Sequence, residues 1–312
     1  MKGFFNFIFL FVFFGCQSQT PHINDQKVTL VVLGTVQDGG SPHIGCQKEC
    51  CSELFKKPDE NRKVVSLGVI DHENHKTYLF EATPDIPSQL DILKELGQKE
   101  TDTPDGIFIT HAHIGHYTGL MYLGREALGA NKAKVYVMPQ MKSFLENNGP
   151  WSQLVALNNI VLEQIDHEKK LVLTKNLSVQ PFKVPHRDEF SETVGFKIIG
   201  PNKTVLFIPD IDKWSKWKKS IIEEIKEVDY AFLDATFFDG DEIDNRDISE
   251  IPHPFAVESM VLFETLPQTE KGKIHFIHFN HTNPLLNPNS EQAKKVLQKG
   301  YHFSRFKDMI KM

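Results

Sequence analysis

The 312-residue sequence lacks several features that would point to particular classes of protein. It has no cluster of lysine and arginine interleaved with aromatic residues, and its net charge is −6, so we expect no nucleic-acid partner. A composition of 40% hydrophobic and 24% charged residues suits one large globular domain or two small ones. Since no internal repeat, low-complexity block or linker divides the chain, we predict one domain over residues 27–312.

The apolar run at the N-terminus is too short to cross a bilayer comfortably, and one lysine precedes it. This pattern predicts a secretory signal peptide over residues 1–15. The Gly15-Cys16 pair resembles a bacterial lipobox, in which the cysteine is lipidated, and residues 16–26 then form a polar tether. We therefore expect an exported lipoprotein, periplasmic or cell-surface, that is anchored to a membrane through Cys16. Plain cleavage and a membrane-anchoring helix are the alternatives.

Three histidines fall within six residues, directly after a strand pattern. Residues 105–110 read as a short buried strand that is followed by His111 and His113, and His116 stands where a helical pattern begins. Packing three imidazoles so closely is unfavourable, because each ring needs partners for both nitrogens. Neutral imidazole is, however, a preferred ligand of zinc and iron. The stretch therefore predicts a metal site.

The rest of the chain alternates short strand patterns with helical ones. Strands are expected at residues 28–34, 64–71, 77–81, 105–110, 133–138, 160–165, 171–173, 177–184, 194–199, 204–208, 230–233 and 273–279. Helices are expected at residues 87–96, 116–128, 214–225, 255–266 and 290–299, with one more after 133–138. Because the strands fall into two halves with helices interposed, we predict two sheets sandwiched between helical layers.

Further side chains that can bind metals follow other strand patterns. His186 comes after residues 179–184, Asp210 after 205–208, and His278 after 274–277. Strand ends along one edge of a sheet are places where ligands from distant parts of a sequence converge. Any one of these residues alone would be unremarkable as a surface or core residue, but four such sites in one chain strengthen the prediction of a metal centre.

This series of histidines and one aspartate resembles the metallo-β-lactamase superfamily. Within it, the sequence is similar to the pyrroloquinoline quinone biosynthesis protein B branch. The similarity runs from about Val28 to Tyr301, and its most specific segment is Pro185–Phe196. The resemblance implies an α/β fold, a four-layer αββα sandwich with the metal site at one edge of its two sheets.

The resemblance also implies two metal positions, one made of three imidazoles and one of two imidazoles with a bridging carboxylate. The first comprises His111, His113 and His186, and the second comprises His116, His278 and the bridging Asp210. The superfamily motif is His-x-His-x-Asp-His, whereas Gly115 stands at the aspartate position here. Because glycine offers no ligand, we expect the second site to bind its metal more weakly. The complete first site favours hydrolase-like chemistry.

Three cysteines, Cys46, Cys50 and Cys51, lie in the predicted loop after the first strand. Members of this branch, and the related cyclic phosphodiesterase of phosphonate breakdown, carry a Cys-x-Cys-x-x-Cys zinc site there. Cys46 and Cys51 fit the outer positions, but Lys48 occupies the middle one and Cys50 is displaced. In the phosphodiesterase a histidine three residues beyond the last active-site histidine completes the site, and His281 stands at that offset from His278.

Three thiolates and one imidazole form a closed tetrahedral zinc site, which would join the first loop to the last ligand strand. A disulfide is the alternative outside the cytoplasm. A bond between the adjacent Cys50 and Cys51 is geometrically unfavourable, and three cysteines leave one thiol over. We favour an additional structural zinc.

The chemistry that we expect is metal-assisted hydrolysis. A metal held by three imidazoles leaves a position for water, whose pKa falls to about 7 to give a metal-bound hydroxide. Asp210 would position that water or bridge to a second ion. His253, after the acidic stretch at 239–250, would act as general acid on the leaving group, and a loop histidine without a role is its alternative. The expected cofactor is zinc, one or two ions, with iron as an alternative.

The expected substrate is a small molecule such as a phosphodiester or another small ester, which the sequence does not identify. Two other functions remain open. An iron-dependent oxygenase or other redox enzyme is one, since imidazole and carboxylate also suit iron. A non-catalytic metal-binding lipoprotein is the other, and Gly115 is the main argument for it. The sequence does not indicate an oligomeric state.

Overall fold

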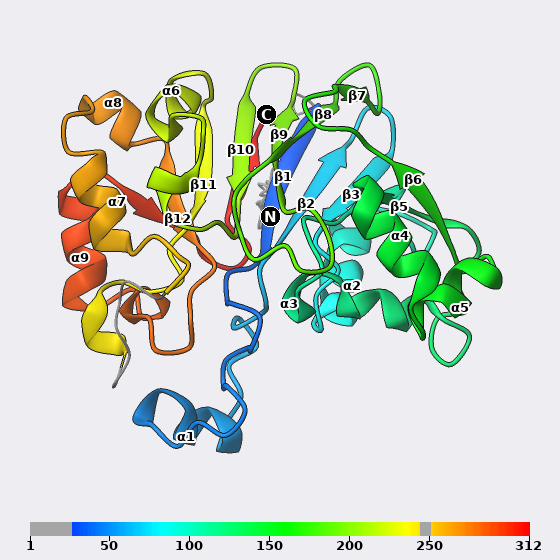
Figure 1. The fold of residues 1–312 in the computed structure, drawn as a ribbon, viewed down its shortest axis with the longest axis horizontal. Helices are drawn as coiled ribbons and strands as arrows, with labels where there is room; N and C mark the ends of the chain where they lie inside the picture. The colour runs from blue at the N-terminus through cyan, green and yellow to red at the C-terminus, as the bar shows by residue number, and fades with distance from the viewer. Residues whose placement is uncertain (1–26, 244–250) are drawn as a thin grey trace, which may run out of the picture.

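A computed structural model describes residues 27–243 and 251–312, which form two seven-stranded sheets (Figure 1). The first sheet has the order β14-β1-β2-β3-β4-β5-β6, with β1 Val28–Gly34, β2 Ser66–Asp71, β3 Lys76–Phe80, β4 Gly106–Phe108, β5 Ala133–Val137, β6 Ile160–Gln164 and β14 Met309–Lys311. The second has the order β13-β12-β11-β10-β9-β8-β7, with β7 Leu171–Val172, β8 Ser178–Lys183, β9 Val194–Ile199, β10 Thr204–Ile208, β11 Tyr230–Asp234, β12 Ile274–Ile277 and β13 His302–Phe303.

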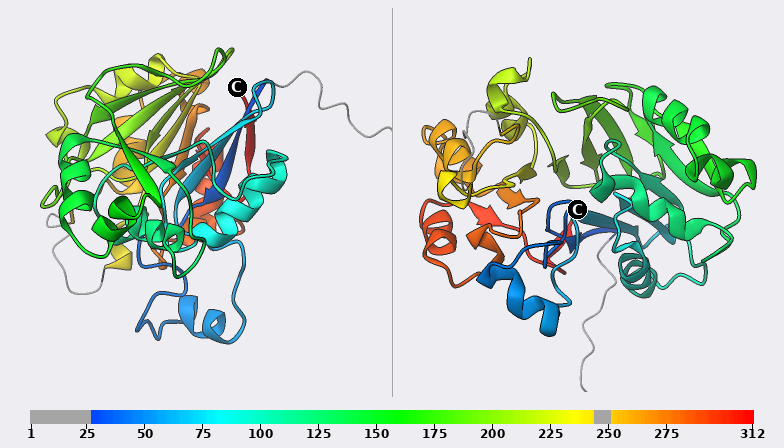
Figure 2. Two further views of the ribbon diagram at one scale, coloured as in Figure 1. Left: turned by 90° about the vertical axis from the view of Figure 1, so that its right-hand side faces the viewer. Right: turned by 60° about the horizontal axis from the view of Figure 1, so that its bottom comes forward.

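Helices cover the outer face of each sheet, on opposite sides of the molecule in Figure 1. Those on the side of the first sheet are α2 Ile86–Leu96, α3 Ile114–Tyr117, α4 Pro139–Asn147 and α5 Trp151–Ala156. Those on the side of the second sheet are α6 Ile221–Lys226, α7 Ala256–Leu262, α8 Gln268–Lys271 and α9 Glu291–Gln298. A further helix, α1 Glu49–Lys56, stands clear of the sandwich, as the left-hand view of Figure 2 shows.

Three apolar cores hold these four layers together. The core between the sheets is rich in aromatic side chains, and the ring of Phe108 lies 4.8 Å from that of Phe80 and 5.7 Å from that of Phe196 on the facing sheet. A second core joins the first sheet to α2, α4 and α5. The third joins the second sheet to α6, α7 and α9. The predicted αββα sandwich in a single domain is therefore confirmed.

Strand direction brings many carboxyl ends to one edge. In the second sheet β10, β11 and β12 are mutually parallel, and β8 runs the same way because both it and β10 pair antiparallel with β9. In the first sheet β3 and β4 are parallel, and β1 shares their direction because both β1 and β3 pair antiparallel with β2. Loops that follow β1, β4, β8, β10, β11 and β12 therefore leave each sheet at its carboxyl edge.

Three local predictions differ from the structure. The helix expected over 116–128 is wrong in extent: α3 gives way to a 3₁₀-helix at Thr118–Leu123. In this segment Gly119 packs directly against the backbone of Thr83, since a β-carbon at position 119 would lie 2.0 Å from the Thr83 carbonyl oxygen. The helix expected over 214–225 is broken at extended Trp217, and α6 begins after Ser220, whose hydroxyl accepts a hydrogen bond from the Glu223 amide. Cys50 and Cys51 lie on helix α1, not in a loop.

The predicted signal peptide, tether and lipid anchor at Cys16 lie outside the described residues and stay predictions. Within residues 27–243 and 251–312, none of the helices has the length and apolar character needed to span a membrane.

Candidate metal centre

Every metal ligand that the sequence predicts for the active site lies at the carboxyl edge of the two sheets. His111 and His113 follow β4, and His116 lies on the single turn of α3. His186, Asp210 and His278 follow β8, β10 and β12 respectively. These residues are spread over 167 positions of the chain, from 111 to 278. In the structure all of them belong to one contiguous cluster of polar groups.

A first group consists of three imidazoles and one carboxylate. The ligand atoms of His111, His113, His186 and Asp210 all lie within 4.8 Å of one another. One oxygen, Oδ2 of Asp210, lies 3.3 Å from Nε2 of His111, 3.9 Å from Nδ1 of His113 and 3.1 Å from Nε2 of His186. One nitrogen of each ring thus faces a common point. The structure brings together the residues predicted for the first metal position.

A second group contains a carboxylate that the sequence analysis did not anticipate. Asp38, His116, Asp210 and His278 hold their ligand atoms within 4.8 Å of one another. Oδ1 of Asp38 lies 3.0 Å from Nε2 of His116 and 3.3 Å from Nε2 of His278. Oδ2 of Asp210 lies 3.8 Å from the same nitrogen of His116, so Asp210 belongs to both groups.

Gly115 lies directly against Asp38. A β-carbon at position 115 would meet Cα of Asp38 at 2.5 Å and its Cγ at 2.7 Å, which no side chain tolerates. Asp38 can therefore occupy this position only because residue 115 is a glycine.

His253 joins the cluster from a loop before α7. Its Nδ1 lies 2.9 Å from Oδ2 of Asp234 and 3.1 Å from Oδ1 of Asp210. Asp234 is the last residue of β11 and is fully buried. Together with His278 these residues form a third group of potential ligands within 4.8 Å. The position of His253 beside Asp210 agrees with a role in the site.

Hydrogen-bonding side chains orient the ligand rings through their outward nitrogens. The hydroxyl of Thr110 lies 2.8 Å from Nδ1 of His111, and that of Thr236 lies 2.8 Å from Nδ1 of His278. Such partners fix the orientation and tautomer of metal-binding imidazoles. Nδ1 of His116 faces Oε1 of the buried Glu81 at 3.5 Å, a charge contact in which neither atom makes a hydrogen bond.

Neighbouring charges set the protonation of these buried groups. Burial, together with the neighbouring His116, holds the pKa of His111 well below its ordinary value. Burial alone would also lower the pKa of His116, but the carboxylates of Asp38 and Glu81 raise it well above the ordinary value. Burial would raise the pKa of Asp38, yet His116 lowers it well below the usual range. The neighbouring carboxylates therefore favour the protonated form of His116, whereas burial favours the neutral form of His111.

Near Asp234, too, carboxylates outweigh burial and raise the pKa of two histidines. Burial lowers the pKa of His253, but Asp234 and Asp210 outweigh it and raise the pKa to about 10. For His278, hydrogen bonds with Asp234 and Asp38 likewise outweigh burial and raise the pKa to about 9. Metal ligands must be neutral imidazoles, so binding of a divalent cation displaces such protons.

An unsatisfied nitrogen shows that the cluster fits a metal ion. Among the residues that the structure describes, Nε2 of His111 is buried and makes no well-oriented hydrogen bond, although Oδ2 of Asp210 lies 3.3 Å from it. A buried polar atom without a partner costs free energy, and a cation at the common point would satisfy it. Imidazoles with carboxylates are a donor set that suits zinc and also iron.

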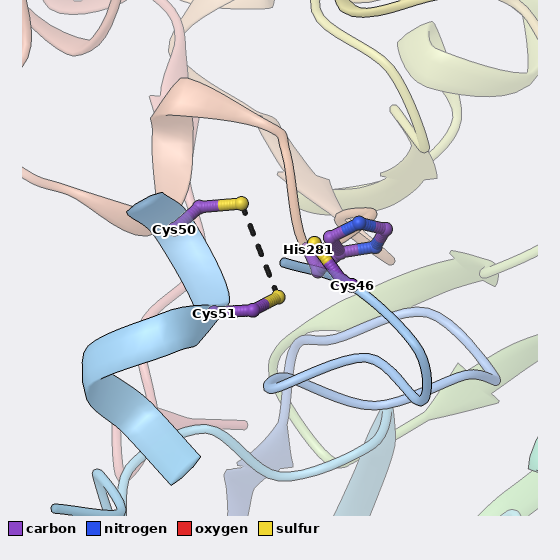
Figure 3. A group of neighbouring side chains, drawn as sticks. All are labelled: Cys46, Cys50, Cys51 and His281. Atoms are coloured by element: carbon purple, nitrogen blue, oxygen red, sulfur yellow. Dashed lines mark hydrogen bonds between the residues drawn. The ribbon is translucent and has the colours of Figure 1, made fainter. Parts of the chain in front are cut away.

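The cysteines form a separate group with His281 (Figure 3). Cys50 and Cys51 project from α1 towards Cys46 and His281, and the four ligand atoms lie within 4.8 Å of one another. All three cysteines are free in the described part of the chain. Burial, with the charges of His43 and Lys48, lowers the pKa of His281 to about 4, so its imidazole is neutral at pH 7. The group has the composition of a closed zinc site.

Three residues of the centre escaped sequence reasoning: Asp234 and Glu81, which are fully buried, and Asp38, which is partly exposed. Asp234 ends a strand pattern, as Asp210 nearly does, so the same rule would have found it. Glu81 directly follows β3 and is completely buried. Asp38 stands four positions after β1 in a turn, and only its packing against Gly115 indicates its place.

Comparisons with known proteins agree with this geometry. A family model described as a β-lactamase superfamily domain matches residues 76–279. Coenzyme PQQ synthesis protein B of Methylorubrum extorquens (strain PA1) is 23% identical over 299 residues, covering 87% of this chain and 96% of that protein.

Two solved structures share the fold over most of the chain. The crystal structure of Zn(2+)-bound PqqB from Methylobacterium extorquens has a TM-score of 0.74 at 20% identity and covers 91% of this chain and 100% of its own. The structure of a diphosphatase from the PhnP family has a TM-score of 0.62 at 22% identity, with 91% and 96% covered. The resemblance to the quinone branch is therefore confirmed, and the chain belongs to the metallo-β-lactamase superfamily.

Proposed function

We propose that the protein is a metal-dependent hydrolase that acts on a phosphodiester or another small ester. The observation that carries the proposal is the first group, in which three imidazole nitrogens and a carboxylate oxygen face one point. An ion bound there supplies a Lewis acid, which lowers the pKa of bound water to roughly 7 and polarises a substrate oxygen. A structure with the same fold is described as a diphosphatase, which supports a phosphate-containing substrate.

The exposure of the side chains indicates where a substrate enters. His113 is 15% exposed and His253 is 10% exposed, whereas His111 and Asp210 are exposed by 1% and 4%. We therefore propose that a substrate approaches the centre from the side on which His113 and His253 are partly exposed. Exposed Ile114, next to His113, offers it an apolar contact.

The chain's own residues would divide the work as follows. His111, His113 and His186 hold the ion, and Asp210 orients the attacking water or bridges to a second ion. His253, held through Nδ1 by Asp234, has Nε2 as its remaining nitrogen. That nitrogen donates a proton to the leaving-group oxygen as the bond between this oxygen and phosphorus or carbon breaks.

The test combines metal analysis with an assay. We expect zinc in the purified protein and hydrolysis of bis(p-nitrophenyl) phosphate. Chelation should lower this activity by roughly 100-fold or more, and added zinc should restore it, because the ion supplies several kcal/mol of transition-state stabilisation. His275→Ala, at a histidine on β12 stacked on His302 outside the metal groups, should leave the activity unchanged.

The same experiment separates the alternatives. Since imidazole and carboxylate ligands also suit iron, an iron-dependent redox enzyme similar to coenzyme PQQ synthesis protein B is the second candidate. Iron in place of zinc, with oxygen consumption and no ester hydrolysis, would support that candidate. A fully metal-loaded protein that hydrolyses neither phosphate nor carboxylate esters would support a non-catalytic binding protein. Either result would overturn the hydrolase proposal.

We also propose that Cys46, Cys50, Cys51 and His281 hold a structural zinc. Cys51→Ser should remove one zinc per chain and lower the Tm by roughly 10 °C or more, because structural zinc contributes directly to folding free energy and each kcal/mol is worth about 2–4 °C. Atomic emission and calorimetry measure these effects, and Ser52→Ala on the same helix is the control. If the wild-type Tm falls with dithiothreitol while zinc content is unchanged by Cys51→Ser, a disulfide is present instead.

A further inference from the structure

The carboxylate of Asp38 has the surroundings of a metal ligand. Its Oδ1 faces Nε2 of both His116 and His278, at 3.0 and 3.3 Å, and no cationic lysine or arginine pairs with it among the contacts described for residues 27–243 and 251–312. Its partners are themselves buried, with His116 and His278 showing no exposed surface. The carboxylate oxygen and the two imidazole nitrogens therefore face one another, as the ligands of a common ion would.

The neighbouring glycine explains how Asp38 reaches this place. Any side chain at position 115 would overlap the backbone of Asp38, since its β-carbon would lie 2.5 Å from Cα. The loop after β1 can approach α3 only because this space is empty. The carboxylate therefore comes from a segment 78 positions away from His116, not from the histidine segment itself.

We infer that Asp38 is a ligand of the second metal position and that Gly115 is the residue that admits it. The second position then has four protein donors: Asp38, His116, Asp210 and His278. Gly115 is thus no sign of a weakened site, because the carboxylate is supplied from another loop. The inference rests on the proposed metal centre, but not on which reaction that centre performs.

Metal content and affinity test the inference without reference to activity. Wild type and Asp38→Asn are purified, and zinc per chain is counted by mass spectrometry, with a competitive zinc indicator used to measure the weakest active-site affinity. Asp38→Asn is nearly isosteric, so the fold is preserved. We expect one zinc fewer per chain, or a loss of more than ~100-fold in affinity for that ion, since even the loss of an outer-shell partner costs 10–100-fold.

Two controls isolate the effect. Asp59→Asn changes another carboxylate of the same connection between β1 and β2, one that pairs with Arg62, and should leave zinc content unchanged. The cysteine group is intact in all these variants, so its zinc cancels in the comparison.

A substitution at Gly115 provides a second, independent test. Gly115→Ala should displace Asp38 and lower the affinity for the second ion by roughly 10-fold or more, although it removes no ligand. Gly272→Ala is the matched control, because a β-carbon at 272 meets nothing closer than 3.4 Å.

Equal zinc content and affinity in wild type and Asp38→Asn would overturn the inference, as would a wild type that binds a single active-site ion. Failure of the proposed hydrolase is a different result. In that case the protein would show no ester hydrolysis, while Asp38→Asn would still lose its ion.

Discussion

Asp210→Asn is expected to lower kcat/KM for phosphodiester hydrolysis by about 10³-fold and to remove the ions of both metal positions. The reason is its central place: Oδ2 lies 3.1–3.9 Å from one nitrogen of each of four histidines, His111, His113, His116 and His186. Polarisation by a metal ion is worth several kcal/mol, and each ~1.4 kcal/mol is a factor of ten. Steady-state kinetics and zinc analysis of the same preparation measure both effects.

The matched control is Asp212→Asn, two residues further along the chain. The carboxylate of Asp212 pairs with Lys216 at 2.7 Å and belongs to none of the metal groups found in the described residues. Its replacement should leave activity and zinc content within about two-fold of wild type, because the ion pair that is lost has a largely exposed lysine and lies outside the metal groups. Retention of both ions in Asp210→Asn would show that the carboxylate is not the shared ligand.

The sequence sufficed to predict those parts of the centre that depend on strand direction. His186, Asp210 and His278 could be placed because each follows a strand, and parallel strands deliver their carboxyl ends to one edge. The same logic covers His111 and His113 after β4. Local patterns are enough for such predictions, because short apolar runs rich in β-branched residues and bounded by turn residues indicate buried strands.

Asp38 could not be placed in this way. It lies in a turn whose path depends on the space left at Gly115, and no local pattern records a contact over 77 positions. The extent of α3 failed for a related reason, since Gly119 packs against the backbone of Thr83 and tertiary contact overrides helical periodicity there. Predictions from a single sequence are therefore least reliable at residues whose backbone packs closely against another part of the backbone.

The proposed roles of the residues in the centre follow from whether each residue lies at a strand end or in a loop. Residues at strand ends are held by the rigid sheets, and they are the ones that meet around a common point. His253 and Asp38 come from loops, and both lie on the partly exposed side of the cluster, with side chains 10% and 12% exposed. In the proposed mechanism the residues at strand ends would hold the first ion, His253 would transfer the proton, and Asp38 would complete the second metal position.

His253→Gln is expected to slow hydrolysis of a substrate with an alkyl alcohol leaving group by about 10²–10⁴-fold, the range that general acid catalysis contributes. With p-nitrophenolate as the leaving group the loss should stay below roughly ten-fold, because this group departs without a proton. Comparison of kcat/KM for methyl and p-nitrophenyl phosphodiesters measures the difference.

The geometry also predicts the effect of replacing Asp234, the carboxylate next to His253. A loss of zinc on replacement of His253 would identify His253 as a metal ligand instead. Asp234 lies 2.9 Å from Nδ1 of His253 and orients its ring, so Asp234→Asn should show the same dependence on the leaving group with a smaller loss. His253 also belongs to a group of potential ligands with Asp210 and His278. If His253 were a ligand, its replacement would release zinc and slow both substrates equally. Unchanged zinc with a selective loss for the alkyl leaving group is the signature of a proton donor.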